Sequence, residues 1–199
     1  MRIFSLLFVL ILSGCMGPAP FAIKQADNRF SESKIAVYTS QNNRISSKSI
    51  AGGTHINARG VFINPYISKK PNGKIDSLGF NITNLTDTSS LYGSPNQLGI
   101  IQEISFKLSN GHLVKAQASG QKSQHYGGVY YNSVTRGASM EKSESAIVEI
   151  SKKDFIELAN AKSIACKITG SKRSVTYNQS DIADTFLANI KSFQMKHVN

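Results

Sequence analysis

The chain has 199 residues, of which 40% are hydrophobic and five are proline, and its formal net charge is +11. This composition favours a folded core over a disordered stalk, and the length suits one domain. We see no internal repeat, heptad pattern or low-complexity tract.

The first segment begins with a positive charge at Arg2 and continues as an apolar run from Ile3 to Leu12, broken at Ser5. As a helix this run would span roughly 15 Å, about half the hydrocarbon thickness of a bilayer. It therefore predicts a signal-peptide core and not a membrane span. The small residues Ser13 and Gly14 then suit a peptidase cleft, and Cys15 offers a thiol for acylation.

The sequence Leu12-Ser13-Gly14-Cys15 resembles the lipobox of bacterial lipoproteins. This resemblance covers about the first 16 residues. It implies a diacylglyceryl group on the Cys15 sulfur, cleavage before Cys15 and usually an acyl chain on the new amino terminus. Residue 16 is Met and not the Asp common in lipoproteins retained in the inner membrane, so the family rule implies the outer membrane, with the periplasmic face favoured. The alternative is an ordinary cleaved signal followed by a coincidental cysteine.

We therefore expect a signal peptide over residues 1–14, a lipidated tether over 15–20 and one β-rich domain over 21–199. Five tether residues reach at most about 17 Å, so the domain would lie close to the membrane.

Period-two alternation beyond the tether predicts mainly strands. The expected ranges are 35–39, 60–67, 78–85, 99–108, 112–118, 146–150, 164–169 and 174–177. Pro65 places the second of these at a sheet edge or a bend.

One hairpin can be assigned a register. A three-residue loop at Ser109-Asn110-Gly111, with Gly111 left-handed, would pair Phe106 with Val114 and Ile104 with Ala116. A two-residue turn would place these apolar residues opposite Lys115 and Gln117, so we expect the longer loop.

Two helices are predicted near the end of the chain. Ser151 and Asp154 have capping-box spacing for a short helix through Ala161. A longer helix over residues 180–196 carries one apolar stripe formed by Ile182, Phe186, Ile190 and Phe193. The predicted fold class is α+β: a mainly antiparallel curved sheet with a short helix and a longer C-terminal helix packed on one face.

The chain shows no recognisable catalytic pattern. His55, His112, His125 and His197 share no metal-ligand spacing, and we expect His112 and His197 to be solvated. No serine lies in a nucleophile elbow, and no carboxylate pair is placed for acid–base chemistry. Cys166 alternates with Ile164 and Ile168, which predicts a buried and inert thiol. We expect no metal, no cofactor beyond the acyl groups on Cys15, and no enzymatic activity; a hydrolase of unrecognised type is the weaker alternative.

Residues 119–139 lack apolar periodicity and are rich in Gly, Ser and Tyr. They form either a flexible β-excursion or a recognition loop, because tyrosines bury much area at low entropic cost. The partner-binding residues of such a loop would be Tyr126, Tyr130, Tyr131 and Arg136.

Between Ser33 and Ile75 the chain has seven basic residues and no acidic one. They form either a solvated surface or a site for anions such as lipid headgroups or lipopolysaccharide phosphates. These residues are Lys34, Arg44, Lys48, Arg59, Lys69, Lys70 and Lys74.

These features together favour a lipid-anchored, non-catalytic envelope protein that binds or scaffolds another envelope protein. The alternative is an accessory protein that binds anions or cell wall through residues 33–75. Nucleic acid is not an expected partner, because the predicted compartment and the motifs do not support it.

Overall fold

The computed structural model describes residues 20–27, 34–46, 59–88, 97–133 and 137–199. Cys15, Lys48, His55 and Arg136 therefore lie outside the described residues. The strands are β1 (Ala22–Gln25), β2 (Ala36–Gln41), β3 (Gly60–Lys69), β4 (Ile75–Thr88), β5 (Ile101–Leu108), β6 (Leu113–Asn132), β7 (Gly137–Glu149), β8 (Ile164–Gly170) and β9 (Ser174–Tyr177). The helices are α1 (Lys152–Ala159), a 3-10 turn (Gln179–Asp181) and α2 (Asp184–His197).

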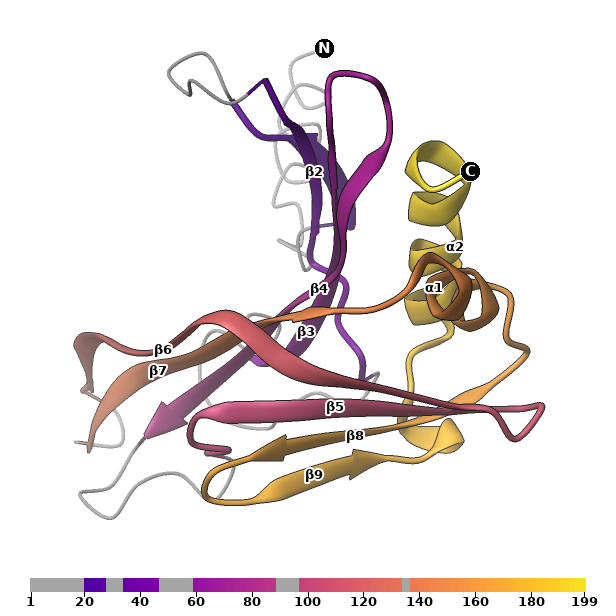
Figure 1. The fold of residues 1–199 in the computed structure, drawn as a ribbon. Coiled ribbons are helices and arrows are strands. Elements are labelled where there is room, and N and C mark those ends of the chain that lie inside the picture. Colours follow the sequence, from indigo (N-terminus) through magenta and orange to yellow (C-terminus); the bar gives the residue numbers. More distant parts are fainter. Residues whose placement is uncertain (1–19, 28–33, 47–58, 89–96, 134–136) are drawn as a thin grey trace, which may run out of the picture.

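The strands form one antiparallel sheet in the order β1-β2-β3-β4-β7-β6-β5-β8-β9. The long strand β6 joins its two parts: residues 113–117 pair with β5, and residues 118–132 pair with β7. Irregular pairing between Ser119 and Ser123 marks the point where β6 leaves β5. Because bulges bend a strand and increase its twist, the two parts of the sheet diverge strongly there, as Figure 1 shows.

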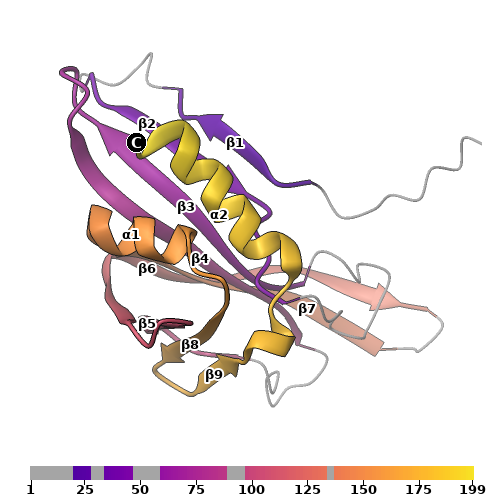
Figure 2. The same cartoon turned by 90° about the vertical axis from the view of Figure 1, so that its right-hand side faces the viewer.

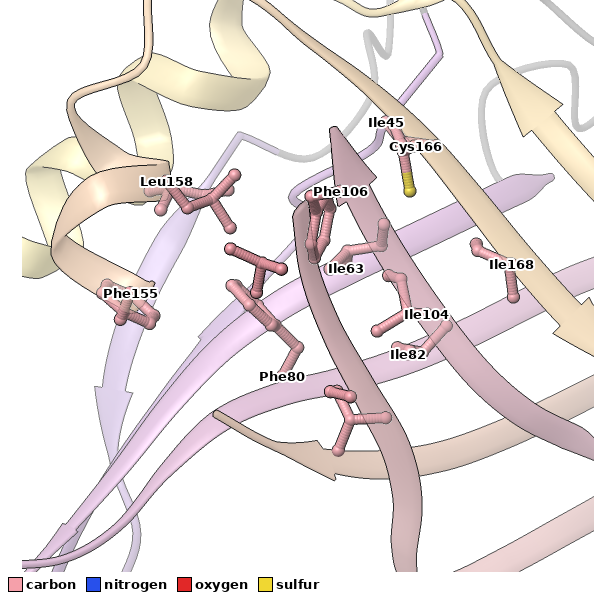
Figure 3. Close-up of a cluster of buried hydrophobic side chains, with 14 of the residues drawn as sticks. Ile45, Ile63, Phe80, Ile82, Ile104, Phe106, Phe155, Leu158, Cys166 and Ile168 are labelled. Atoms are coloured by element: carbon pink, nitrogen blue, oxygen red, sulfur yellow. The ribbon is translucent and has the colours of Figure 1, made fainter. Parts of the chain in front are cut away.

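Both helices pack against the inner face of this curved sheet, with α2 lying across β2 and β3 (Figure 2). Phe80 of β4 contacts Phe106 of β5 and Phe155 of α1, at centroid distances of 5.7 and 5.5 Å. Phe155 in turn contacts Phe193 of α2 at 6.1 Å. This aromatic chain runs through one continuous cluster of buried side chains, part of which is drawn in Figure 3. The predicted fold class is confirmed: the structure is a mainly antiparallel curved sheet with a short helix and a longer C-terminal one.

The hairpin between β5 and β6 has the predicted register. Phe106 pairs with Val114, Ile104 pairs with Ala116, and Gly111 has a φ of 85°. The capping prediction for α1 also holds, since the Ser151 Oγ accepts a hydrogen bond from the Asp154 N–H at 3.0 Å. α2 begins later than predicted, at Asp184, because the chain first makes the 3-10 turn and a bridge between Ile182 and Ser46.

Pro65 lies in an interior strand, not at a sheet edge, because β3 is bordered by β2 and β4. The N–H of Ile63 donates to the Asn43 carbonyl on the β2 side, and alternate residues of a strand present their N–H groups to the same side. The missing N–H of Pro65 therefore faces β2, where the regular pairing ends at Thr39 and the chain turns through Asn42 at a φ of 63°. Proline is tolerated where the ladder is already interrupted.

Candidate functional site

The segment expected to be either a β-excursion or a recognition loop is part of a long β-ribbon. Residues 119–132 of β6 pair with residues 137–147 of β7, and we call this unit the ribbon. Strand β4 borders β7 as far as the pair Thr88–Met140. Beyond that pair, the described parts of β6 and β7 extend from the sheet together, as seen at the left of Figure 1.

Three exposed apolar side chains share one face of the ribbon, which we call the ribbon face. Tyr126 pairs with Lys142, Val129 with Met140 and Tyr131 with Ala138. Residues directly opposite in a pair share a face, and the β7 partners follow one another at every second position. Their exposed fractions are 59% for Tyr126, 69% for Val129 and 68% for Tyr131.

A bulge at Gly127 and Gly128 creates this alignment. Tyr126 and Val129 are three residues apart, so in a regular strand they would point to opposite faces. The pairing shifts by one residue between them, and the extra residue brings Val129 onto the face of Tyr126. A period-two search of the sequence cannot find this stripe, although the Gly-Gly pair is a usable signal for a bulge.

The inner end of the ribbon face is held by a buried ion pair. The Lys142 Nζ lies 3.2 Å from the Glu144 Oε1, and both side chains are 0% exposed. Glu144 also accepts hydrogen bonds from the backbone N–H groups of Leu98 and Gly99, at 2.8 and 2.9 Å. Its third donor is the Asn84 amide at 2.9 Å. The carboxylate thus ties the segment before β5 to β4 and β7.

Tyr126 is positioned by the same cluster. The Lys142 Nζ lies 5.3 Å from the centroid of the Tyr126 ring, within the range of a cation–π contact. The Lys142 Nζ also donates to the Gln97 Oε1 at 3.0 Å. The ring therefore sits on a fixed ammonium at one edge of the ribbon face, with more than half of its surface exposed.

Of the other predicted partner-binding residues, Tyr130 pairs with Ser139 in the ribbon, and Arg136 lies outside the described residues. Sequence reasoning missed Val129, because its alignment with Tyr126 depends on the strand register across the bulge. It also missed Lys142 and Glu144, which look like ordinary surface charges in the sequence.

The structure does not bring the predicted basic residues into one site. Arg59 is 4% exposed and forms an ion pair with Glu141 of β7, so it is a structural residue of the ribbon base. Arg44 is half-buried, and its guanidinium lies beside Gly60. Lys34, Lys69, Lys70 and Lys74 lie together elsewhere, where β2 begins and β3 turns into β4.

His112 and His197, which were expected to be solvated, are each partly exposed and also have partners. The His112 Nε2 lies 3.1 Å from the Asp154 Oδ1 and 3.6 Å from the Glu157 Oε2, which links the β5–β6 hairpin to α1. A hydrogen bond from Ser151 is the main cause that lowers the pKa of Asp154, and His112 lowers it further. The His197 ring stacks on Tyr38 at a centroid distance of 4.4 Å.

Cys166 is buried as predicted, at 1% exposed, and burial raises the pKa of its thiol. Figure 3 shows its side chain inside the apolar cluster. Among the described residues no group of three His, Cys, Asp or Glu side chains is arranged to hold a metal ion. None of the described helices has the length and apolarity needed to cross a membrane.

Comparison with family models, curated proteins and solved structures finds no match to this chain.

Proposed function

We propose that this chain is a lipid-anchored, non-catalytic envelope protein that binds another protein through the ribbon face. The observation that carries the proposal is the alignment of Tyr126, Val129 and Tyr131 on one face, each more than half exposed. In this proposal the anchor is an acylated Cys15, and the outer membrane, on its periplasmic side, is the place of action.

The ribbon face has the chemistry of a protein-binding surface. Tyrosine buries a large area at low entropic cost and keeps a hydroxyl for hydrogen bonding, which makes it frequent in binding hot spots. The ion pair at its base orders Tyr126 before a partner arrives, and such preorganisation lowers the entropic cost of binding. Three side chains are fewer than a standard interface needs, so they act as its centre and a wider part of the ribbon as its rim.

The clustering of exposed apolar residues distinguishes this surface from the rest of the molecule. The large hydrophobic side chains exposed elsewhere in the described chain are Ile100, Leu113 and Met195, which lie on three different elements or connections. Scattered exposed hydrophobics are normal on a soluble surface, whereas a contiguous group marks an interaction site. Leu113 and Met195 therefore serve as matched controls.

The test introduces a photoreactive amino acid at Val129 of the full chain, expressed in its own envelope. We expect a discrete protein adduct that persists at high salt, and no equivalent adduct from the same probe at Leu113. The captured protein is then identified and purified. Its affinity for the full chain should fall about 30-fold or more in Tyr131→Ser, since a hot-spot residue contributes about 2 kcal/mol, and remain unchanged in Leu113→Ser.

Equal adducts from positions 129 and 113 would contradict the proposal. So would an affinity that is insensitive to Tyr131→Ser and to Val129→Ser. Circular dichroism of each variant shows whether the fold is retained.

A further inference from the structure

Lysines from three separate elements meet at one end of the molecule. Ala36 at the start of β2 pairs with Lys69, and the Lys70 N–H donates to the Lys74 carbonyl in the turn between β3 and β4. The last turn of α2 reaches the same place, because His197 stacks on Tyr38, which pairs with Ile67 of β3. We call this set the basic end: Lys34, Lys69, Lys70, Lys74 and Lys196.

Two of these charges act on His197 at the end of α2. After burial, which is the main cause, Lys69 and Lys196 both lower the pKa of this imidazole. The two lysines come from β3 and α2, so their convergence is a product of the fold and not of local sequence.

Acidic groups offset this charge in part. Two acidic residues are found among the described residues at this end of the strands: Asp27, which follows β1, and Asp76 in β4. The Lys70 Nζ is 3.4 Å from the Asp76 Oδ1, and their side chains are 54% and 35% exposed. An ammonium in such an exposed pair stays largely hydrated and can still face a second anion. Lys34 and Lys74 are exposed as well, so the basic end keeps a positive excess.

We propose that the basic end rests on the phosphate headgroups of an anionic phospholipid surface. This inference depends on the proposed function for its membrane anchor. Ammonium groups and phosphates have complementary charge. A short tether would keep the basic end permanently close to the anionic surface of the bilayer.

The tether length is compatible with this pose. The carbonyl of Pro20, where the described chain begins, accepts a hydrogen bond from the Asn42 amide at the far end of β2. The six residues of β2 place about 20 Å between that point and the basic end. Five tether residues reach about 17 Å, so a moderate tilt brings both points to one surface.

The same pose carries the ribbon away from the membrane. Strand β4 starts beside the basic end at Ile75 and runs 14 residues to Thr88, which borders the ribbon. That length is about 45 Å if the strand were straight, and the curvature of the sheet shortens it. Docking of the basic end would therefore present Tyr126, Val129 and Tyr131 to a partner outside the bilayer.

The experiment measures contact between the basic end and lipid in the full, natively processed chain. A fluorophore is attached to Pro71→Cys in the β3–β4 turn or, as a control, to Ser109→Cys in the β5–β6 turn. The native Cys166 thiol is buried and does not compete for the label. The protein is reconstituted with vesicles of phosphatidylglycerol and phosphatidylcholine in equal parts or of phosphatidylcholine alone, each doped with a headgroup-spin-labelled lipid.

We expect quenching at position 71, not at 109, in the anionic vesicles, and its loss at high salt. Replacing Lys34, Lys70, Lys74 and Lys196 by Gln should weaken the docked state about five-fold per lysine. The matched control replaces the exposed lysines Lys107, Lys115, Lys167 and Lys172 by Gln and should leave the quenching unchanged.

Absence of quenching at position 71 in anionic vesicles would overturn the proposal, as would equal sensitivity to the control replacements. If position 71 is not quenched in anionic vesicles but is shielded by a protein in native envelopes, the proposal is also overturned. The basic end would then bind an acidic protein instead of lipid. Flotation with phosphatidylcholine vesicles reports the anchor separately, so a failed anchor and a failed headgroup contact give different results.

Discussion

Glu144 is the residue on which the base of the ribbon most depends. Its carboxylate accepts from two backbone amides and one side-chain amide and faces the ammonium of Lys142, all without contact with water. Desolvating both charges is costly, and the surrounding hydrogen bonds offset that cost. Removing one partner leaves the other charge buried and uncompensated.

We therefore expect Glu144→Gln to lower the free energy of unfolding by about 3–5 kcal/mol. Urea denaturation at neutral pH measures this loss. The double variant Lys142→Met/Glu144→Gln removes the orphaned ammonium and should recover part of the stability.

A neighbouring control keeps this test specific. Thr86 pairs with Lys142 across β4 and β7, and its buried hydroxyl has no hydrogen-bond partner among the described residues. Thr86→Val has nearly the same shape and loses no hydrogen bond, so it should not destabilise the protein. A loss in Glu144→Gln no larger than that in Thr86→Val would contradict the role given to the carboxylate.

His197 predicts a pH dependence of stability. Burial, Lys69 and Lys196 lower its pKa in the folded state below the usual 6.5, so the unfolded chain binds a proton more readily. The contribution of neutral His197 is complete above about pH 6.5 and is lost as the pH falls from there through the lowered folded pKa.

Urea midpoints between pH 7.5 and 5 should therefore decrease more steeply in the native chain than in His197→Phe, which keeps an aromatic ring against Tyr38. His112→Phe is the comparison variant on the far hairpin. Parallel pH profiles for the native chain and His197→Phe would show that the imidazole carries no such linkage.

At the scale of the elements, backbone register decides which side chains the ribbon presents. The Gly127-Gly128 bulge rotates Val129 and Tyr131 onto the face of Tyr126. A one-residue shift turns every following side chain to the other face of a strand. The function proposed for the ribbon therefore depends on the backbone register between Tyr126 and Val129 as much as on the tyrosines.

Deleting both Gly127 and Gly128 would place Val129 directly after Tyr126 and therefore on the opposite face of the strand. This double deletion should abolish the adduct formed by a probe at Val129 and weaken partner binding as strongly as Tyr131→Ser. Gly128→Ala is the matched control, because a Cβ at this position meets no atom within 4 Å. Both variants should keep the thermal transition of the core, which the ribbon tip does not enter. Full binding by the deletion variant would show that the shared face is not what the partner recognises.

At the scale of the whole molecule, the long strands separate two surfaces of different character. The basic end lies where β3 turns into β4, and the ribbon face lies near the opposite end of β4. Between them the two helices and the curved sheet enclose the apolar core. This separation would allow the molecule to contact lipid and protein at the same time, provided that the chain is anchored.

The anchor itself gives a direct prediction. The intact mass of the natively expressed protein should lack residues 1–14 and should include a diacylglyceryl group and an additional acyl chain on Cys15. Two or more acyl chains on one protein are sufficient to hold it stably on a bilayer. Cys15→Ser should lose this added mass and the cleavage that accompanies it, and an unmodified Cys15 in the native product would exclude the proposed anchor.

Local patterns in the sequence were sufficient for much of the fold. The pairing of Phe106 with Val114 follows from a short loop and alternating apolar residues, and the cap at Ser151 follows from spacing within one helical turn. The buried face of α2 is likewise a stripe of Phe186, Ile190 and Phe193. Each of these depends on residues close together in the chain, so the sequence by itself determined them.

The pairing of the ribbon strands and the burial of the charged side chains at its base were decided only by the tertiary structure. Residues 119–139 lack apolar periodicity, and their strands form because β6 pairs with the next strand, β7, and β7 pairs with β4, which is distant in the sequence. Arg59 and Lys142 carry the same charge as surface lysines, yet Glu141 and Glu144 make their burial possible. Burial of a charge is decided by the partners that the fold brings to it. Glu141 reaches Arg59 from a distant strand, and the amides that hold Glu144 beside Lys142 belong to Asn84, Leu98 and Gly99 outside β7.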